Sequence, residues 1–134
     1  MRIDGQCHCG FVTYEADIDP DEILICHCTD CQRLTGSPYR VTAIVPESAV
    51  RLTGNPPKLY TKIAENGRQR LQYFCPECGS PLFTTGTGED AKTWGIRWGS
   101  IDQRADLKPT RQYWCRSAAG WVGETAALPD VPGD

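Results

Sequence analysis

Short runs that mix β-branched, aromatic and polar residues recur along the chain, and glycine or proline separates most of them. Runs of this kind, bounded by turn-forming residues, predict β-strands. Lys58–Ile63 and Arg70–Phe74 also alternate with a period of two, which predicts strands with one buried face. The other runs that we interpret as strands are Phe11–Ala16, Ile23–Cys26, Tyr39–Val45, Pro81–Thr85 and Thr93–Ile101.

One segment, Thr29–Thr35, favours a helical turn or two. Thr29 or Asp30 can cap its N-terminus, and Gly36 can end it. Elsewhere the apolar positions follow no helical period over more than about ten residues. Residues 118–134 contain five glycines and prolines, and we expect irregular structure there. The whole pattern predicts a mostly β protein with short helical turns.

Composition narrows the range of partners. The chain has 134 residues and a formal net charge of −3, and its length favours one domain over residues 1–134. The mild acidity argues against nucleic acid, because phosphate binding needs a basic face. We expect no membrane partner, since no apolar run has the length of a membrane helix and the N-terminus lacks the apolar region of a signal peptide. The expected compartment is cytoplasmic, and exposed strand edges favour a monomer or a homodimer.

Seven of the eight cysteines lie in three clusters. In a cytoplasmic protein, where thiols stay reduced, such clusters indicate metal ligands before disulfides. The third cluster resembles the knuckle of a zinc ribbon, in which Pro76 fixes the turn and Gly79 lets the chain curl back. In a C-x-C pair, both side chains leave the same side of an extended segment and can reach one ion. The clusters are Cys7-His8-Cys9, Cys26-His27-Cys28-Thr29-Asp30-Cys31 and Cys75-Pro76-Glu77-Cys78-Gly79.

The clusters do not supply enough cysteines for two closed zinc sites, which need eight ligands. A C-x-C pair and a C-x-x-C pair complete one four-cysteine site, and the C-x-C-x-x-C cluster then offers three ligands. A zinc ion with three protein ligands keeps an open position, as in catalytic sites. The spacing does not fix this pairing. The C-x-C-x-x-C cluster could give sulfurs to both ions, and an iron–sulfur cluster also takes four cysteines.

Three further residues bear on the open position. His8 and His27, the two histidines, each lie between two cysteines, so alternation should turn their rings away from the metal. Alternatively, His27 is a fourth ligand or a proton shuttle, since imidazole titrates near neutral pH. Cys115 stands apart from the clusters, which favours a small buried side chain, but it is the spare candidate for the fourth position.

Four motifs, in this order along the chain, resemble the glutathione-dependent formaldehyde-activating enzyme family, which also contains centromere protein V. They are GQCHCGFVTY (Gly5–Tyr14), CHCTDCQRLTGS (Cys26–Ser37), FCPECGSPLF (Phe74–Phe83) and WGSID (Trp98–Asp102). The resemblance covers about residues 1–114. It implies a β-tent, in which antiparallel sheets stack around a structural zinc. One departure is Gln32, which stands where many relatives carry arginine.

The resemblance also implies how the cysteines pair and what each group does. Two zinc ions are implied, one structural and one catalytic. The implied ligands of the structural zinc are Cys7, Cys9, Cys75 and Cys78. The implied ligands of the catalytic zinc, and the implied catalytic residues, are Cys26, Cys28 and Cys31.

The activity implied by the resemblance is that of a carbon–sulfur lyase. It would add a glutathione-like thiol to formaldehyde or a similar small aldehyde, giving S-(hydroxymethyl)glutathione, or cleave that adduct. Three thiolates make zinc a weak Lewis acid, so its chemistry favours activation of the thiol over polarisation of the aldehyde. A thiol that carries carboxylates also needs cationic groups in its site. The candidates are Arg33, Arg40, Arg97, Arg111 and Arg116.

Two other functions fit the same cysteines. The chain could be a non-catalytic zinc-binding domain that holds two structural zinc ions and binds a partner, with Cys115 or a histidine closing the second site. It could also be a zinc-buffering or redox-sensing thiol protein.

Overall fold

The computed structural model describes residues 1–133, in which strands dominate and the helices are short. The prediction of a mostly β protein is therefore confirmed. The strands are β1 (Arg2–Gln6), β2 (Thr13–Asp17), β3 (Ile23–Cys26), β4 (Arg40–Pro46), β5 (Val50–Leu52), β6 (Lys58–Ile63), β7 (Gln69–Phe74), β8 (Pro81–Thr85), β9 (Thr93–Arg97) and β10 (Arg111–Tyr113). The helices are α1 (Thr29–Thr35) and the 3₁₀-helices η1 (Glu47–Ala49), η2 (Gly88–Lys92), η3 (Trp98–Ser100), η4 (Arg104–Asp106), η5 (Cys115–Ser117) and η6 (Val122–Ala127).

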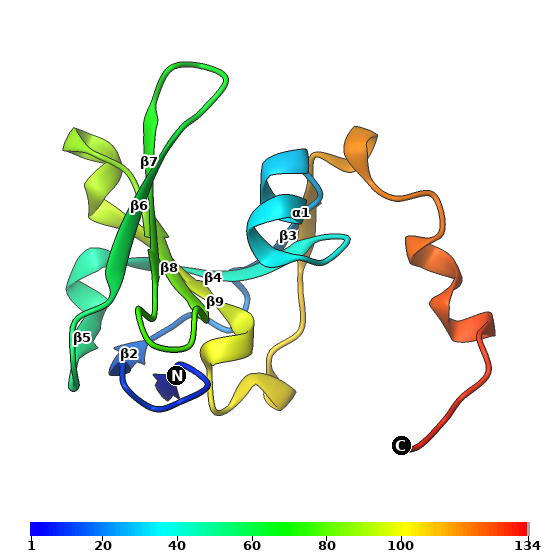
Figure 1. Cartoon of the computed structure of the whole chain (residues 1–134), viewed down its shortest axis with the longest axis horizontal. Coiled ribbons are helices and arrows are strands. Elements are labelled where there is room, and N and C mark those ends of the chain that lie inside the picture. The colour runs from blue at the N-terminus through cyan, green and yellow to red at the C-terminus, as the bar shows by residue number, and fades with distance from the viewer. Residues whose placement is uncertain (134) are drawn as a thin grey trace.

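The strands form a small sheet and a large sheet. The small sheet has the order β1-β2-β5, and the large sheet has the order β10-β3-β4-β9-β8-β7-β6. All of these strand pairs are antiparallel except β10 and β3, which run parallel. A bridge between Gly5 and Ile101 joins the small sheet to the segment after β9. Figure 1 shows the β6–β7 hairpin extending beyond the rest of the large sheet, with α1 beside β3 and β4.

One face of the large sheet forms the hydrophobic core. Residues directly opposite each other on antiparallel strands point to the same side. The register pairs Ile23 with Ala43, Ala43 with Ile96, and Ile96 with Phe83, and all four side chains are at most 1% exposed. The small sheet covers this face with Ile3, Tyr14 and Ala16.

The other face of the same strands carries polar side chains. Cys26 on β3 lies opposite Arg40 on β4, and Thr42 lies opposite Arg97 on β9. Arg40 and Thr42 are two positions apart on one strand, so all four side chains leave the sheet on the side away from the core. This alternation sets a cysteine and two arginines side by side.

Gly95 continues the polar face towards β8. A Cβ atom on Gly95 would lie 2.6 Å from Cγ2 of Thr42 and 2.8 Å from Cγ2 of Thr84. Glycine is therefore needed where these two side chains close over β9. Thr84 in turn lies opposite Gln72 on β7, which places the Gln72 amide on the same face.

Most predicted strands are confirmed, and three agree residue for residue: Ile23–Cys26, Lys58–Ile63 and Pro81–Thr85. The strand predicted to run on to Ile101 instead ends at Arg97, because η3 turns the chain at Trp98. The prediction that Lys58–Ile63 buries one face is wrong. This strand is the edge of the large sheet, and all its residues except Lys62 are exposed.

The predicted helix is confirmed over Thr29–Thr35, and Gly36 ends it with a left-handed φ of 62°. Its predicted N-cap is wrong. Cys28, rather than Thr29 or Asp30, occupies that position, because its sulfur accepts the backbone N–H of Cys31. Among residues 1–133, no helix combines the length and the apolar character needed to cross a membrane.

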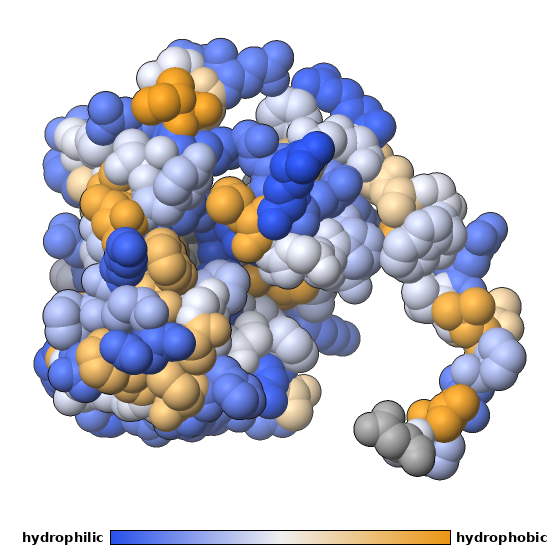
Figure 2. All heavy atoms as spheres, in the orientation of Figure 1, coloured by the Kyte–Doolittle hydropathy of each residue, from blue (hydrophilic) through white to orange (hydrophobic). Residues whose placement is uncertain are grey.

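The chain leaves the body of the protein after residue 117 (Figure 1). As expected, the described part of this segment is irregular apart from η6. Figure 2 shows it as a separate arm, and its large apolar side chains Trp121, Leu128 and Val131 are all more than half exposed.

The contact between the sheets provides a test of the fold. A Cβ atom on Gly5 would lie 2.1 Å from Cζ of Tyr14, whose ring packs edge-on against Phe83 and whose hydroxyl bonds Ser100 Oγ at 2.6 Å. Because this ring cannot move freely, Gly5→Ala should lower the free energy of unfolding by about 1–3 kcal/mol. Denaturant unfolding followed by circular dichroism measures this change. Gly99→Ala is the control, since its Cβ would meet nothing within 4 Å; equal losses in both variants would contradict the packing argument.

Candidate metal and substrate site

Two groups of cysteines come together in the described part of the chain. The first group links the two sheets. Two of its members follow β1, and the other two lie in the turn between β7 and β8. Each pair is followed by a glycine in the left-handed region, Gly10 with φ 82° and Gly79 with φ 79°. The group consists of Cys7, Cys9, Cys75 and Cys78.

The spacing of these sulfurs fits a single tetrahedral metal ion. Sulfurs that each lie about 2.3 Å from a tetrahedral zinc are about 3.8 Å from one another. Cys9 Sγ lies 3.7 Å from Cys7 Sγ and 3.8 Å from Cys75 Sγ. Since all four sulfurs lie within 4.8 Å of one another, the space between them is too small for a cluster of several irons. No disulfide joins any of the eight cysteines, all of which lie in the described part of the chain.

Hydrogen-bond donors stabilise the thiolates of Cys7, Cys75 and Cys78, whereas burial and the contacts with the neighbouring thiols raise the pKa of Cys9. The N–H of Val12 donates to Cys7 Sγ at 3.3 Å, and the N–H of Cys78 donates to Cys75 Sγ at 3.4 Å. The Ser80 hydroxyl is 3.2 Å from Cys78 Sγ, and its hydrogen bond lowers the pKa of the Cys78 thiol to about 5. Such donors reduce the charge density on metal-binding sulfurs.

The second group has three cysteines. Cys26 ends β3, Cys28 caps α1, and Cys31 lies in the first turn of that helix. Their sulfurs lie within 4.8 Å of one another, and each residue is partly exposed. The N–H of Cys31 donates to Cys28 Sγ at 3.3 Å. The local chain alone therefore gathers three soft ligands on one side of a strand-to-helix turn.

The three thiols cannot all ionise easily without a cation. The hydrogen bond from Cys31 lowers the pKa of the Cys26 thiol. The same contact, together with burial, raises the pKa of the Cys31 thiol above its usual range. One thiol thus ionises at the expense of its neighbour, and a bound divalent ion would remove this conflict.

Neither spare candidate joins the three-cysteine group. Cys115 is exposed in η5 and belongs to neither group of close ligand atoms. His27 is only 2% exposed, but its Nε2 lies 2.7 Å from Gln112 Oε1, and its ring packs edge-on against Tyr39. His8 is exposed beside the four-cysteine group. Neither histidine belongs to a group of close ligand atoms in the described part of the chain.

The C-terminal part of the sheet holds this turn in place. The N–H of His27 donates to the carbonyl of Tyr113 in β10, and the Gln32 amide donates to the carbonyls of His27 and Ser117. Gln32 therefore ties α1 to the segment that follows β10. Sequence reasoning did not assign this role because the two segments are 85 residues apart.

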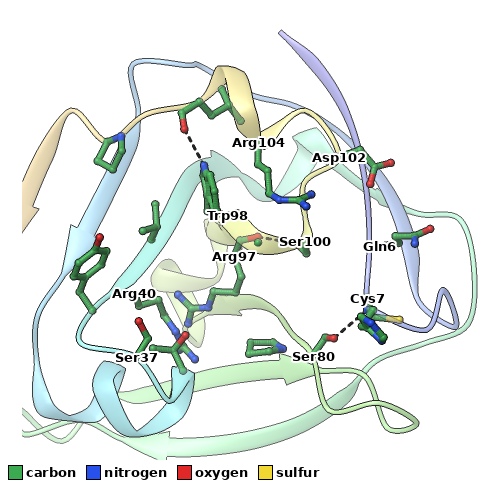
Figure 3. Close-up of a pocket in the computed structure, with 18 of the residues that line it drawn as sticks. Gln6, Cys7, Ser37, Arg40, Ser80, Arg97, Trp98, Ser100, Asp102 and Arg104 are labelled. Carbon is green, nitrogen blue, oxygen red and sulfur yellow. Dashed lines mark hydrogen bonds between the residues drawn. The ribbon is translucent and has the colours of Figure 1, made fainter. Parts of the chain in front are cut away.

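A cavity of about 870 Å³ is lined by Arg40, the cross-strand neighbour of Cys26, and also by Cys7 of the four-cysteine group. None of Cys26, Cys28 and Cys31 lines it. Figure 3 shows that side chains from several segments point into it, with Arg40 and Arg97 close together on one wall. Ser37 and Tyr39, which follow α1, add hydroxyl groups to the lining. Cys28 lines a second cavity of about 480 Å³ on the side of Lys62 and Trp114.

The structure separates the five candidate arginines. Arg33 is exposed and lines neither cavity, Arg111 pairs with Glu22, and Arg116 stacks on Trp114. Arg40 and Arg97 are buried and line the large cavity.

Sequence reasoning missed Gln72, whose Oε1 accepts hydrogen bonds from both Arg40 and Arg97. The period-two pattern of β7 predicts that Gln72 points to one face of the sheet, but only the strand order places it beside Arg40 and Arg97.

A family model described as glutathione-dependent formaldehyde-activating enzyme matches residues 2–117. Relatives from Emericella nidulans and Penicillium rubens are 33% and 32% identical over 79 and 80 residues. Each match covers 58% of this chain and 39% or 41% of the relative, so the chain spans about two fifths of the curated relatives it matches. Both relatives are named as glutathione-dependent formaldehyde-activating enzymes, and their names mark this activity as provisional.

The fold also has a counterpart among solved structures. The crystal structure of a Rhodobacter sphaeroides protein, a structural-genomics target, matches with a TM-score of 0.65. The match covers 82% of this chain and 99% of that chain at 21% identity. At this identity the likeness concerns the fold alone.

The contact between His27 and Gln112 gives a test of the site geometry. Gln112→Leu leaves a buried imidazole nitrogen without its partner, which should lower the free energy of unfolding by about 1–3 kcal/mol. Gln103→Leu is the matched control, because Gln103 bonds only the exposed N–H of Asp4 and its loss should cost less. Urea unfolding of the two variants measures the difference. A larger loss in the control would contradict the anchoring role of Gln112.

Proposed function

The chain belongs to the glutathione-dependent formaldehyde-activating enzyme family, and from this membership we propose that it is a zinc-dependent carbon–sulfur lyase. Its substrates would be a thiol such as glutathione and a small aldehyde such as formaldehyde. In the forward direction, the thiol sulfur forms a bond to the aldehyde carbon, and the thiol proton ends on the former carbonyl oxygen. The reverse direction breaks this carbon–sulfur bond. No oxidant or reductant is needed.

The observation that carries the proposal is the difference between the two cysteine groups. Four thiols stand close together in one group, while three stand together in the other, which among residues 1–133 includes no fourth cysteine sulfur and no histidine nitrogen. We assign Cys7, Cys9, Cys75 and Cys78 to a structural zinc. We assign Cys26, Cys28 and Cys31 to a catalytic zinc. A zinc ion held by three thiolates keeps one position in which a substrate thiol can be stabilised as a thiolate.

The residues around the three-cysteine group suit this reaction. Cys26 lies at the end of a strand and Cys28 at a helix cap, so both backbone segments are fixed by hydrogen bonds. The hydroxyls of Ser37 and Tyr39 line the large cavity and can donate a hydrogen bond to the aldehyde oxygen, where negative charge develops during addition. Burial of the reactants in the cavity would limit competing hydration of the aldehyde.

The metal assignment has a direct test. The purified protein should contain two zinc ions per chain, one for each cysteine group. Cys28→Ser should lose about one of them and keep the fold, whereas Cys115→Ser should keep both, because Cys115 lies outside the groups. Plasma mass spectrometry after desalting gives the metal content. A single zinc in the wild type, with no change in Cys28→Ser, would rule out the second site.

The reaction can be followed by NMR exchange spectroscopy of ¹³C-formaldehyde mixed with glutathione. The wild-type protein should speed the exchange between formaldehyde and its hemithioacetal. Cys28→Ser should lose this effect by on the order of 100-fold, because it removes a ligand of the reactive centre, while Cys115→Ser should retain it. A protein that holds both zinc ions but does not accelerate the exchange would instead be a non-catalytic zinc-binding domain.

A further inference from the structure

Arg40 and Arg97 are buried cations that form no ion pair with a carboxylate in the described part of the chain. Their residues are 4% and 8% exposed. Every ion pair among residues 1–133 involves other basic side chains. Buried charges are costly unless a counter-charge and hydrogen bonds compensate them.

Neutral oxygens satisfy only part of this pair. Gln72 Oε1 accepts from Arg40 Nη1 at 3.2 Å and from Arg97 Nη2 at 2.8 Å, and Thr42 Oγ1 accepts from Arg97 Nη1 at 2.8 Å. Arg40 Nε has no hydrogen-bond partner, although it is buried. The two forks meet at one amide oxygen, and both side chains line the cavity. Figure 3 shows the two guanidinium groups beside each other at this wall.

Both side chains remain charged at neutral pH. Burial, and then the repulsion of Arg40, lower the pKa of Arg97 to about 9, which is still above neutrality. Burial also lowers the pKa of Arg40, and the nearby thiols of Cys31, Cys28 and Cys26 oppose that shift. Arginine keeps its proton in proteins. The pair is therefore a dication with a shared neutral acceptor.

Most of the other charged side chains that line the cavity are also positively charged. Arg104 and Lys108 add two cations, and Asp102 is its one carboxylate among the described residues. A volume of about 870 Å³ suits a ligand of peptide size rather than a small ion. A planar guanidinium fork matches a carboxylate in geometry as well as in charge.

We propose that Arg40 and Arg97 form a carboxylate-binding site that holds the thiol substrate, so that this chain selects thiols bearing a carboxylate over neutral thiols. This proposal rests on the proposed function for its substrate, and it names the part of that substrate which the buried pair holds. Gln72 would position the two forks, since its single oxygen fixes both. A neutral thiol would offer the two guanidinium groups no carboxylate.

The test uses S-methylglutathione, which keeps both carboxylates but cannot react. Isothermal titration of the zinc-loaded full chain should detect its binding, and Arg97→Gln or Arg40→Gln should raise the Kd about tenfold or more. Arg97→Lys, which keeps the charge but not the fork, should bind with intermediate affinity. Arg33→Gln is the control, because Arg33 is exposed and outside the cavity. Its Kd should match that of the wild type.

Two further ligands identify the source of the carboxylate. The diethyl ester of S-methylglutathione should bind about tenfold or more weakly to the wild type, a comparison that needs no variant to fold. Formate alone should bind weakly and compete poorly, because it fills little of the cavity. If the ester binds as well as the acid, or if both glutamine variants fold, retain zinc and bind the acid like the wild type, the proposal is wrong. Strong binding of formate would assign the pair to a free carboxylate and would also overturn it.

The outcomes also separate this site from the lyase activity. Because S-methylglutathione has no free thiol, its binding does not depend on catalysis. Arginine-dependent binding without any exchange of glutathione and formaldehyde would support the carboxylate site and reject the lyase. Equal acceleration of exchange with glutathione and with 2-mercaptoethanol, together with unchanged analogue binding in the variants, would support the lyase and reject the carboxylate site.

Discussion

The alternation of side chains along β4 is the constraint on which both the core and the candidate site depend. Ala43 and Val45 point into the core, while Arg40 and Thr42 point to the opposite face. A slip of one residue would put an arginine into the core. Since β4 lies between β3 and β9, the same register also fixes Cys26 and the partner arginine on β9. The apolar packing on one face therefore determines where the chemistry on the other face stands.

The electrostatics of that second face is cooperative. Three close thiols resist full ionisation, and two close guanidiniums resist burial. Each set lowers the free-energy cost of burying the other set's charges. The thiols near Arg40 favour its charged form, and a cation near the thiols favours thiolates. The shared acceptor Gln72 keeps the two arginines from separating. Such an arrangement contributes little to stability by itself, because burial opposes every charge in it. Its value lies in holding charges at fixed positions for a ligand.

Much of this could be predicted from the sequence, and the limits have physical causes. The apolar runs predict most strands of the large sheet, and the cysteine spacing predicts metal ligands. The division of the cysteines into two groups came from the family resemblance, because the spacing leaves the pairing open. The strands Arg2–Gln6, Val50–Leu52 and Arg111–Tyr113 have only three to five residues, so their pairing comes from neighbours rather than from local preference. The choice of Arg40 and Arg97 among five arginines needed the strand order, which no local pattern contains. The separation of Cys115 from the two cysteine groups also depends on the strand order and could not be predicted from a local pattern.

The two cysteine groups also differ in how far apart along the chain their members lie. The four-cysteine group joins positions 66 residues apart, so a metal there would close a long loop and link the two sheets. The three-cysteine group lies within six consecutive residues, whose strand and helix are held by other contacts. A metal bound by it would close no long loop and would add little to the stability of the fold. The three-cysteine group is thus the one on which the fold depends least, so a metal held there would be free to exchange a ligand without loosening the protein.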